Sequence, residues 1–244
     1  MDLDIMRCTH CGSDKYVKNG PYQGSQRFRC KNCLRYFSDK VRKFNYSDKE
    51  KFLQLYLKNT GIRNAAKIIG CSPSLLVRWV RELAGNLREQ LEKVSFSIPP
   101  DSLPDVIEMD ELYTRVKKGA CRVPVWVARS RRLGKVVAFT IGTGLDCAKN
   151  LYISAKRAVG NIGKIYTDGN AMYKSAFEEL GVSDLHSVAY GKSETHLIES
   201  VNSSIRDNLA RFNRKSKRYS KCEKMLRDTL LLFFHEKQFC ISMK

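Results

Sequence analysis

The spacing of apolar residues divides the chain into a helical first part and a second part in which strands and helices alternate. Between residues 47 and 83, apolar positions recur every three or four residues and predict three helices, broken at Gly61 and Gly70. From Val106 onward, short apolar runs predict strands, and longer amphipathic segments between them predict helices. Residues 94–104 contain three of the six prolines, so we expect a linker there.

The second part follows the order strand, strand, strand, helix, strand, helix, strand, helix, which is the order of a ribonuclease H-like domain. A last amphipathic helix follows a basic segment. We therefore predict an α/β, ribonuclease H-like catalytic domain over residues 105–244, ending in a basic helical tail. The expected strands are Val106–Val116, Val123–Arg129, Lys135–Ile141, Ile162–Thr167 and Asp184–Ala189, and the expected helices are Asp146–Val159, Asn170–Leu180, Thr195–Arg211 and Lys221–Phe239.

Residues 44–93 are predicted to form a helix-turn-helix domain. Gly70 closes the second helix, and Ser72-Pro73 starts the third after a tight turn. In this arrangement the later helix enters the major groove of DNA, which makes Ser74, Arg78 and Arg81 the candidate contacts. A small three-helix bundle without a DNA-binding role is the alternative.

The first 43 residues are predicted to form a zinc ribbon. Two Cys-x-x-Cys pairs, Cys8 with Cys11 and Cys30 with Cys33, stand at the separation typical of a four-thiolate zinc site. The chain starts without a signal-peptide pattern, so its nine cysteines favour thiols and metal binding over disulfides. Basic and aromatic residues surround the four cysteines and give the ribbon a surface suited to nucleic acid.

The formal net charge is +19, and the basic residues are concentrated before residue 100 and after residue 190. Basic ends suit a polyanion, and a nearly balanced middle suits a domain that binds divalent cations. The run 211–221 is predicted to bind the DNA backbone without sequence preference. The side chains expected to make these contacts are Arg214, Lys215, Lys217 and Arg218. No apolar run approaches the ~20 residues of a membrane span. We expect a cytoplasmic, nucleoid-associated prokaryotic protein.

Acidic residues mark the ends of predicted elements in the second part. Asp168 follows the strand Ile162–Thr167 directly, at the carboxyl edge where reactive groups of open α/β sheets lie. Taken alone, Asp168-Gly169 is more typical of a plain turn, and the other acidic segments favour a functional role. Glu199 lies near the start of a later helix, on which Asn202 at i+3 and Arg206 at i+7 share its face. Arg206 is a candidate to hold a ligand carboxylate or a DNA phosphate, and a solvated helix face is the alternative.

A further acidic segment, Glu108-Met109-Asp110-Glu111, lies in the first strand of this part. Glu108 and Asp110 share one face of the strand, whereas Glu111 points away, and the spacing does not choose between the first two. Acids on two strands and a helix indicate a carboxylate cluster for two Mg²⁺ ions, with Mn²⁺ as an alternative, of the kind that cleaves phosphodiesters.

The chain resembles the transposases of the insertion-sequence-one family, which belong to the DDE (Asp-Asp-Glu) superfamily. The resemblance implies that Asp110, rather than Glu108, joins Asp168 and Glu199 as the catalytic triad. It also implies Mg²⁺-dependent cleavage and strand transfer on double-stranded DNA, with terminal repeats and target DNA as substrates, and at least a homodimer. The segments that carry it are Gln26–Cys30, Arg63–Gly70, Met109–Leu112, Thr167–Gly169, Ile198–Asn202, Arg206 and Leu209–Ser216.

Two other functions remain open from the sequence. The first is a zinc-ribbon and helix-turn-helix regulator whose C-terminal half only dimerises, although a binding module has no reason to retain acids at three separate motifs. The second is a ribonuclease H-like nuclease, which would not need two DNA-binding modules. Metal-dependent nicking and strand transfer on DNA that contains an element end would separate these functions.

Overall fold

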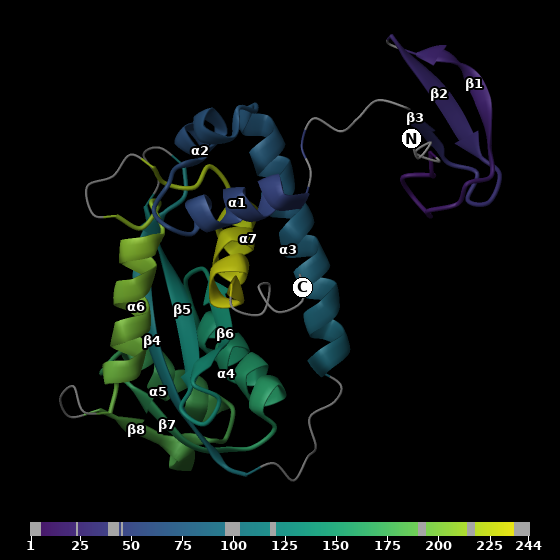
Figure 1. Cartoon of the computed structure of the whole chain (residues 1–244). Coiled ribbons are helices and arrows are strands. Elements are labelled where there is room, and N and C mark those ends of the chain that lie inside the picture. Colours follow the sequence, from purple (N-terminus) through teal and green to yellow (C-terminus); the bar gives the residue numbers. More distant parts are fainter. Residues whose placement is uncertain are drawn as a thin grey trace. The chain divides into compact units, whose positions relative to one another are not determined.

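The computed structural model describes residues 6–22, 24–38, 44, 46–95, 103–117, 121–189, 194–213 and 218–236. It divides into two compact units, Met1–Asp48 and Lys49–Lys244. The first contains the cysteine-rich ribbon, and the second contains the helices α1–α3 together with the α/β part (Figure 1).

The first unit is a three-stranded antiparallel sheet with very few core residues. Its strands are paired in the order β1-β2-β3. Phe28 and Phe37 are stacked with ring centroids 5.6 Å apart, and Tyr16 meets both rings edge-on. Among the described residues, these rings, three cysteines and Met6 make up the apolar interior, so a unit of this size needs further stabilisation. The strands are β1 (Tyr16–Tyr22), β2 (Ser25–Cys30) and β3 (Tyr36–Ser38).

The second unit is built on a five-stranded mixed sheet with the strand order β6-β5-β4-β7-β8. The strands β4, β5 and β6 form an antiparallel meander, and β7 and β8 extend the sheet in parallel from the other edge of β4. β4 is therefore central and has an antiparallel neighbour on one side and a parallel neighbour on the other. The strands are β4 (Asp105–Arg115), β5 (Arg122–Ser130), β6 (Lys135–Ile141), β7 (Ile162–Thr167) and β8 (His186–Val188).

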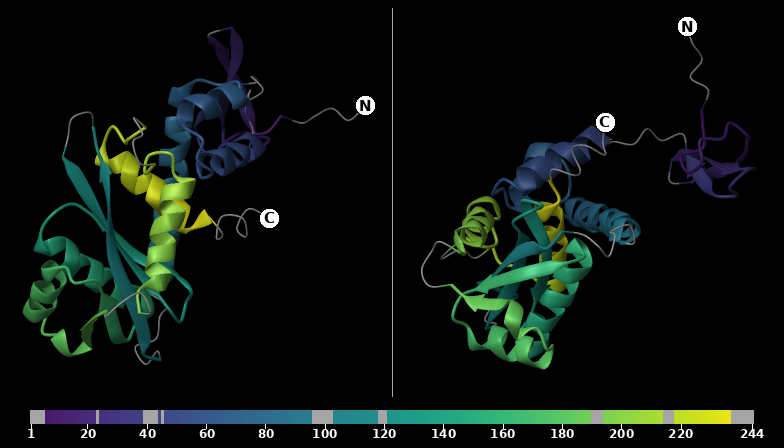
Figure 2. Two further views of the ribbon diagram at one scale, coloured as in Figure 1. Left: turned by 90° about the vertical axis from the view of Figure 1, so that its left-hand side faces the viewer. Right: turned by 90° about the horizontal axis from the view of Figure 1, so that it is seen from below.

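Helices cover both faces of this sheet, as Figures 1 and 2 show. On one face, α4 and α5 pack on a core of apolar residues that includes Ile107, Met109 and Trp126. The other face carries α6 and α7, and Phe139 of β6 contacts Phe234 of α7 there with ring centroids 5.4 Å apart. The helices are α4 (Leu145–Val159), α5 (Ala171–Glu179), α6 (His196–Asn208) and α7 (Glu223–Phe234), with a short 3₁₀ turn, η1 (Ser183–Leu185), before β8.

The element order β4-β5-β6-α4-β7-α5-β8-α6 confirms the order of strands and helices predicted from the apolar pattern. The main differences are at the ends: β8 is shorter than the predicted strand because η1 occupies its start, and α6 ends at Asn208 instead of residue 211. The expected linker 94–104 is only partly described, since α3 continues to Ser95 and residues 96–102 lie outside the described part. No helix within the described residues is long and apolar enough to span a membrane.

The three helices α1 (Tyr46–Tyr56), α2 (Ile62–Ile69) and α3 (Pro73–Ser95) form a small cluster that packs against the α/β part. Phe52 lies at its centre, stacked on Tyr56 and in contact with Trp79. The Tyr56 hydroxyl is buried and bonds to Thr229 Oγ1 of α7 at 2.8 Å, and Arg211 also donates to it. The helical segment that the sequence suggested as a domain of its own therefore shares a polar and apolar interface with the α/β part.

An ion pair between Arg88 of α3 and Asp228 of α7 reinforces this interface. The Asp228 side chain is 1% exposed, and its Oδ2 atom has no hydrogen-bond partner among the described residues. We expect Arg88→Met to destabilise the unit by about 3 kcal/mol, because it leaves a buried carboxylate without its cation. Scanning calorimetry should show a melting temperature lower by roughly 6–12 °C.

The double variant Arg88→Met/Asp228→Leu is the matched control for this pair. Replacing both partners by apolar residues removes the unpaired charge, so most of the lost stability should return. Equal destabilisation of the single and double variants would contradict a role for the ion pair.

Candidate functional site

The register of β4 with β7 brings two of the predicted acids together. The last residues paired between these parallel strands are Met109 and Thr167. Asp110 and Asp168 come directly after them, so both lie at the edge of the sheet where β7 has ended. The carboxyl end of a strand at such a point is where ligands of open α/β sheets bind.

Glu111 joins Asp110 and Asp168 in a single group of carboxylates. One oxygen from each of the three side chains lies within 4.8 Å of the others. On the strand, Glu111 does point to the opposite face from Asp110, as the strand period requires. It reaches the group nevertheless, because β7 stops at Thr167 and leaves this edge of β4 open to side chains from both faces. Strand alternation places Glu111 on the face opposite Asp110, so this contact could not be expected from the sequence.

The helix α6 covers Asp110 from the other side. Asn202 is 2% exposed and donates from Nδ2 to Asp110 Oδ2 at 2.7 Å, while the Glu111 amide donates to Asp110 Oδ1 at 2.7 Å. Glu199, one turn earlier on α6, is exposed and lies outside the three-carboxylate group, although its charge acts on Asp110. Arg206 is half-buried further along the same helix.

Glu108 has a different environment from Asp110. It is fully buried, pairs with Arg131 Nε at 2.7 Å and accepts the Ile198 amide at 2.9 Å. This carboxylate therefore ties the first turn of α6 to the centre of the sheet. The structure separates the two acids that strand spacing alone left equivalent: Glu108 has a cation partner, whereas Asp110 faces other carboxylates.

Electrostatic repulsion and burial both act on the carboxylate group. Burial raises the pKa of Asp110, and the negative charges of Asp168 and Glu199 raise it further. Burial also raises the pKa of Glu111, with added contributions from Asp168 and Asp110. A divalent cation would remove this repulsion, and a set of oxygen donors from several elements is the kind that Mg²⁺ and Mn²⁺ bind. The residues present therefore fit such an ion.

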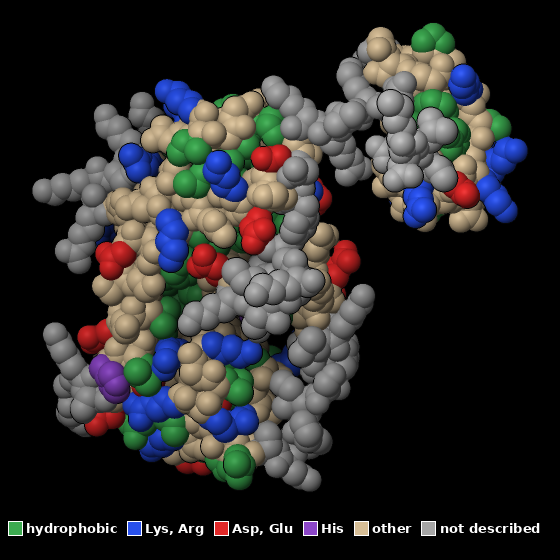
Figure 3. Space-filling view, viewed as in Figure 1, with side chains coloured by type: hydrophobic (Ala, Val, Ile, Leu, Met, Phe, Trp, Pro, Cys, Tyr) green, Lys and Arg blue, Asp and Glu red, His purple; other side chains and the backbone are tan. Residues whose placement is uncertain are grey.

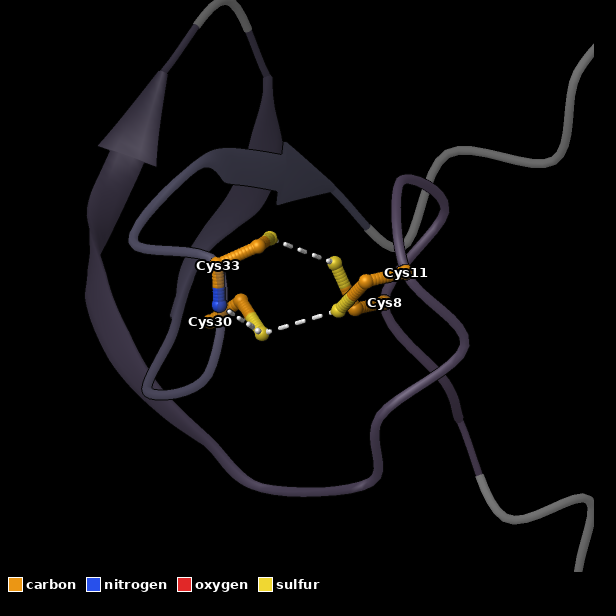
Figure 4. A group of neighbouring side chains, drawn as sticks. All are labelled: Cys8, Cys11, Cys30 and Cys33. Carbon is orange, nitrogen blue, oxygen red and sulfur yellow. Dashed lines mark hydrogen bonds between the residues drawn. The ribbon is translucent and has the colours of Figure 1, made fainter.

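The four predicted cysteines of the ribbon come together at a second centre. Their sulfur atoms lie within 4.8 Å of one another, with Cys8 and Cys33 at 3.7 Å and Cys11 and Cys30 at 3.6 Å (Figure 4). A tetrahedral site with metal–sulfur bonds of about 2.3 Å needs sulfur separations of about 3.8 Å. A hydrogen bond from the backbone of Cys33 lowers the pKa of Cys30 to about 6, whereas burial and the neighbouring cysteines raise the pKa of Cys33 to about 11. The geometry fits a four-thiolate zinc site.

Comparison with known proteins identifies the family. The family model described as "IS1 transposase" matches residues 105–240, which is more than half of the chain. The chain belongs to the IS1 transposase family. The match covers the sheet, the carboxylate group and α7, and it ends close to the last described residues. No curated protein sequence matches this family member.

Solved structures show weaker similarity. The catalytic core domain of BIV integrase is 13% identical, with 52% of this chain and 81% of that chain covered and a TM-score of 0.36. A chain of the simian T-cell lymphotropic virus intasome, solved in complex with PP2A regulatory subunit B56 gamma, is 18% identical, with a TM-score of 0.33. That second likeness covers 55% of this chain and 50% of the intasome chain.

The side chains predicted to contact DNA lie on α3, on α6, which carries Arg206, and after α6. Ser74, Arg78 and Arg81 are all exposed, at positions i, i+4 and i+7 of α3, so they share one face. Arg218 is exposed, whereas Arg214, Lys215 and Lys217 fall outside the described residues. Lys and Arg side chains appear on the visible face of both units of this IS1-family chain (Figure 3).

The first residue of the basic run does not face solvent as a backbone-tracking side chain would. Arg211 donates to Ser220 Oγ at 2.7 Å and to the Met225 carbonyl at 3.3 Å, and its guanidinium lies 5.3 Å from the centre of the Tyr56 ring. Arg211 thus has a structural role at the α1–α7 interface. Its charge alone gave no sign of this, because a basic residue in a basic run is normally solvated.

Proposed function

We propose that this chain is the DDE transposase of an insertion sequence, which binds terminal inverted repeats and catalyses DNA strand cleavage and strand transfer. The observation that carries the proposal is the grouping of Asp110 and Asp168, from adjacent parallel strands, in a member of the IS1 transposase family. The strand order supports a ribonuclease H-like catalytic domain over residues 105–244. We assign Asp110, Asp168 and Glu199 as the catalytic acids.

The chain's own residues would prepare the site for phosphodiester chemistry. Asn202 and the Glu111 amide hold the two oxygens of Asp110, so its carboxylate has one fixed orientation. The Asn170 amide donates to Asp168 Oδ1 at 3.1 Å and holds the second acid at the end of β7. Mg²⁺ ions bound by these acids would activate the attacking water or hydroxyl and stabilise the leaving oxygen. Arg206 on α6 is assigned to a DNA phosphate.

The DNA-binding part of the proposal rests on α2, α3 and the ribbon. The turn between the helices is closed by Gly70, whose left-handed backbone (φ 74°) carries an amide bonded to the Ala66 carbonyl. The exposed face of α3 would enter the major groove as in helix-turn-helix proteins. The ribbon, held by one Zn²⁺, would add non-specific contacts, as would Arg214, Lys215, Lys217 and Arg218 of the basic run. Two element ends must be joined, so at least a homodimer acts in the complex.

The test is strand cleavage on duplex DNA that carries the element end, with purified full-length protein. Cleavage at the end in the presence of Mg²⁺, followed by joining of the released 3′-hydroxyl to a second duplex, is the expected result. Specific binding of the end without cleavage under Mg²⁺ or Mn²⁺ would refute the transposase and indicate a regulator. Cleavage that ignores the end sequence would indicate a nuclease.

Arg78 provides a separate prediction for recognition. We expect Arg78→Ala to weaken binding to end DNA about tenfold or more, because a base contact contributes roughly 1–3 kcal/mol of discrimination. Binding to a scrambled duplex should change far less. The control is Arg157→Ala, which removes an equal charge from an exposed position on α4. Equal losses for both variants in a fluorescence anisotropy titration would show a charge effect instead of recognition.

A further inference from the structure

Buried polar atoms without partners surround the three-carboxylate group. Glu111 Oε2, Asn202 Oδ1 and the Tyr173 hydroxyl have no hydrogen bond of normal geometry to any described residue. Tyr173 is fully buried, and its hydroxyl lies next to Glu111, whose charge acts on it together with those of Asp110 and Asp168. Buried polar atoms in native proteins are almost always bonded. Their concentration at one place therefore points to a ligand that binds there.

We propose that Glu111 is a direct ligand of the divalent cation held by Asp110 and Asp168, in addition to the three acids that the proposed function assigns. The catalytic role of this ion rests on the proposed function, whereas its binding rests on the geometry of Glu111 and its neighbours. The ligand atom is Oε2, and the ion belongs to the hard, oxygen-binding class of Mg²⁺ and Mn²⁺.

The surroundings of Glu111 fix its carboxylate in a position to bind. Asn170 Nδ2 donates to Oε1 at 2.5 Å, which leaves Oε2 as the atom available to an ion. Asn170 is itself held as the N-cap of α5, where its Oδ1 accepts the Met172 amide at 3.0 Å. The ring of Tyr173 packs edge-on against Trp126 with centroids 5.2 Å apart, so its hydroxyl is held beside Glu111. This hydroxyl would bond to the bound carboxylate or to water on the ion.

A purely structural role for Glu111 explains these contacts less well. Glu108, three residues earlier on β4, shows what a structural acid looks like in this sheet: full burial, an arginine at 2.7 Å and a backbone amide. Glu111 has no Lys or Arg ion-pair partner among the residues that the structure describes, and its nearest charges are two further carboxylates. Three like charges within 4.8 Å repel one another unless a cation lies between them.

The experiment measures Mn²⁺ binding to the full-length protein with its thiolate metal retained. The paramagnetic resonance signal of free Mn²⁺ gives the dissociation constant, and water-proton relaxation gives the number of waters on the bound ion. Glu111→Gln keeps the acceptor for Asn170 but removes the anionic ligand, and Glu111→Asp keeps the charge but withdraws the carboxylate by one methylene. Glu178→Gln, an exposed glutamate on α5, is the matched control.

We expect Glu111→Gln to raise the dissociation constant tenfold or more and to add one water to the ion, while Glu178→Gln leaves both unchanged. Glu111→Asp should also weaken binding, because its oxygen falls short of the ion. Without added divalent cation, Glu111→Gln should melt no lower than the parent protein, since one repelling charge is gone. This readout shows that the variant is folded.

Two results would overturn the inference. One is an affinity of Glu111→Gln within about twofold of the parent protein. The other is a combination of two observations: Glu111→Gln binds Mn²⁺ more weakly without gaining a water on the ion, and Glu111→Asp binds with full affinity. That combination would identify Glu111 as a nearby charge instead of a ligand. Failure of the proposed function looks different: the parent protein would bind Mn²⁺ through Glu111 yet leave end DNA uncut.

Discussion

Asp168→Asn is expected to abolish DNA strand cleavage and strand transfer while the protein still binds the element end. The variant keeps the shape of the side chain and can still accept the Asn170 amide bond, now at 3.1 Å. It loses the negative charge that a hard cation requires. Cleavage should fall by about a thousandfold or more, the scale of removing a group that stabilises the transition state. Binding should stay the same or tighten, since a charge facing the phosphates has gone.

The measurement is a gel assay of nicked and joined products with Mg²⁺ beside a binding titration on the same DNA. Asp184→Asn supplies the matched control, because it makes the same chemical change at an exposed position before β8. Asp110→Asn and Glu199→Gln should behave as Asp168→Asn does. Cleavage by Asp168→Asn at the parent rate would remove the catalytic assignment altogether. Loss of end binding together with cleavage would instead indicate a folding defect.

Cys30→Ser is expected to release the metal from the ribbon and unfold it. Cys30 is fully buried, and its sulfur is 3.6 Å from that of Cys11 in a group whose geometry suits tetrahedral zinc. The core of this unit is small, with three aromatic rings beside the cysteines and Met6, so metal binding and folding are coupled there. Elemental analysis should find about one zinc per chain in the parent protein and none in the variant.

The ribbon's unfolding can be followed by the exchange of its amide protons, which should become unprotected in residues 16–38 only. Cys121→Ser is the control, because this exposed cysteine lies in the second unit. The absence of zinc from parent protein that was purified without chelators would contradict the four-thiolate site. Retention of metal by Cys30→Ser would exclude Cys30 as a ligand.

Much of the α/β architecture could be predicted from sequence because each element carries its own signal. β6 and β7 have the bounds that their apolar runs predict, and the β5–β6 connection lies at the expected turn before Lys135. Packing between distant segments leaves no such signal. The buried contact of Tyr56 with Thr229 joins residues 173 positions apart, and neither residue differs in type from an ordinary surface or core residue. Its existence depends on the whole fold.

The candidate site shows the same division. Asp168 could be found because a strand, an acid and a glycine stand in order at residues 162–169. Glu111 could not be placed from strand alternation, which sets the face of the sheet but not where the neighbouring strand stops. That end point, at Thr167, decides whether acids on opposite faces can meet. The pairing of Glu108 with Arg131 is likewise a matter of tertiary structure.

If α3 binds DNA as proposed, its packing has a consequence for the sequence of the element end. The helix has 23 residues and is about 34 Å long, close to one turn of B-form DNA. Its exposed arginines and its anchor at Arg88 belong to the same compact unit as the carboxylate group. Under the proposed function, α3 would therefore bind the element end at a fixed distance from the carboxylate group that cuts it. Base substitutions in the element end would be tolerated at positions that no side chain contacts. One inserted base pair, in contrast, would rotate the bond to be cut by about 34° relative to the bases that α3 contacts.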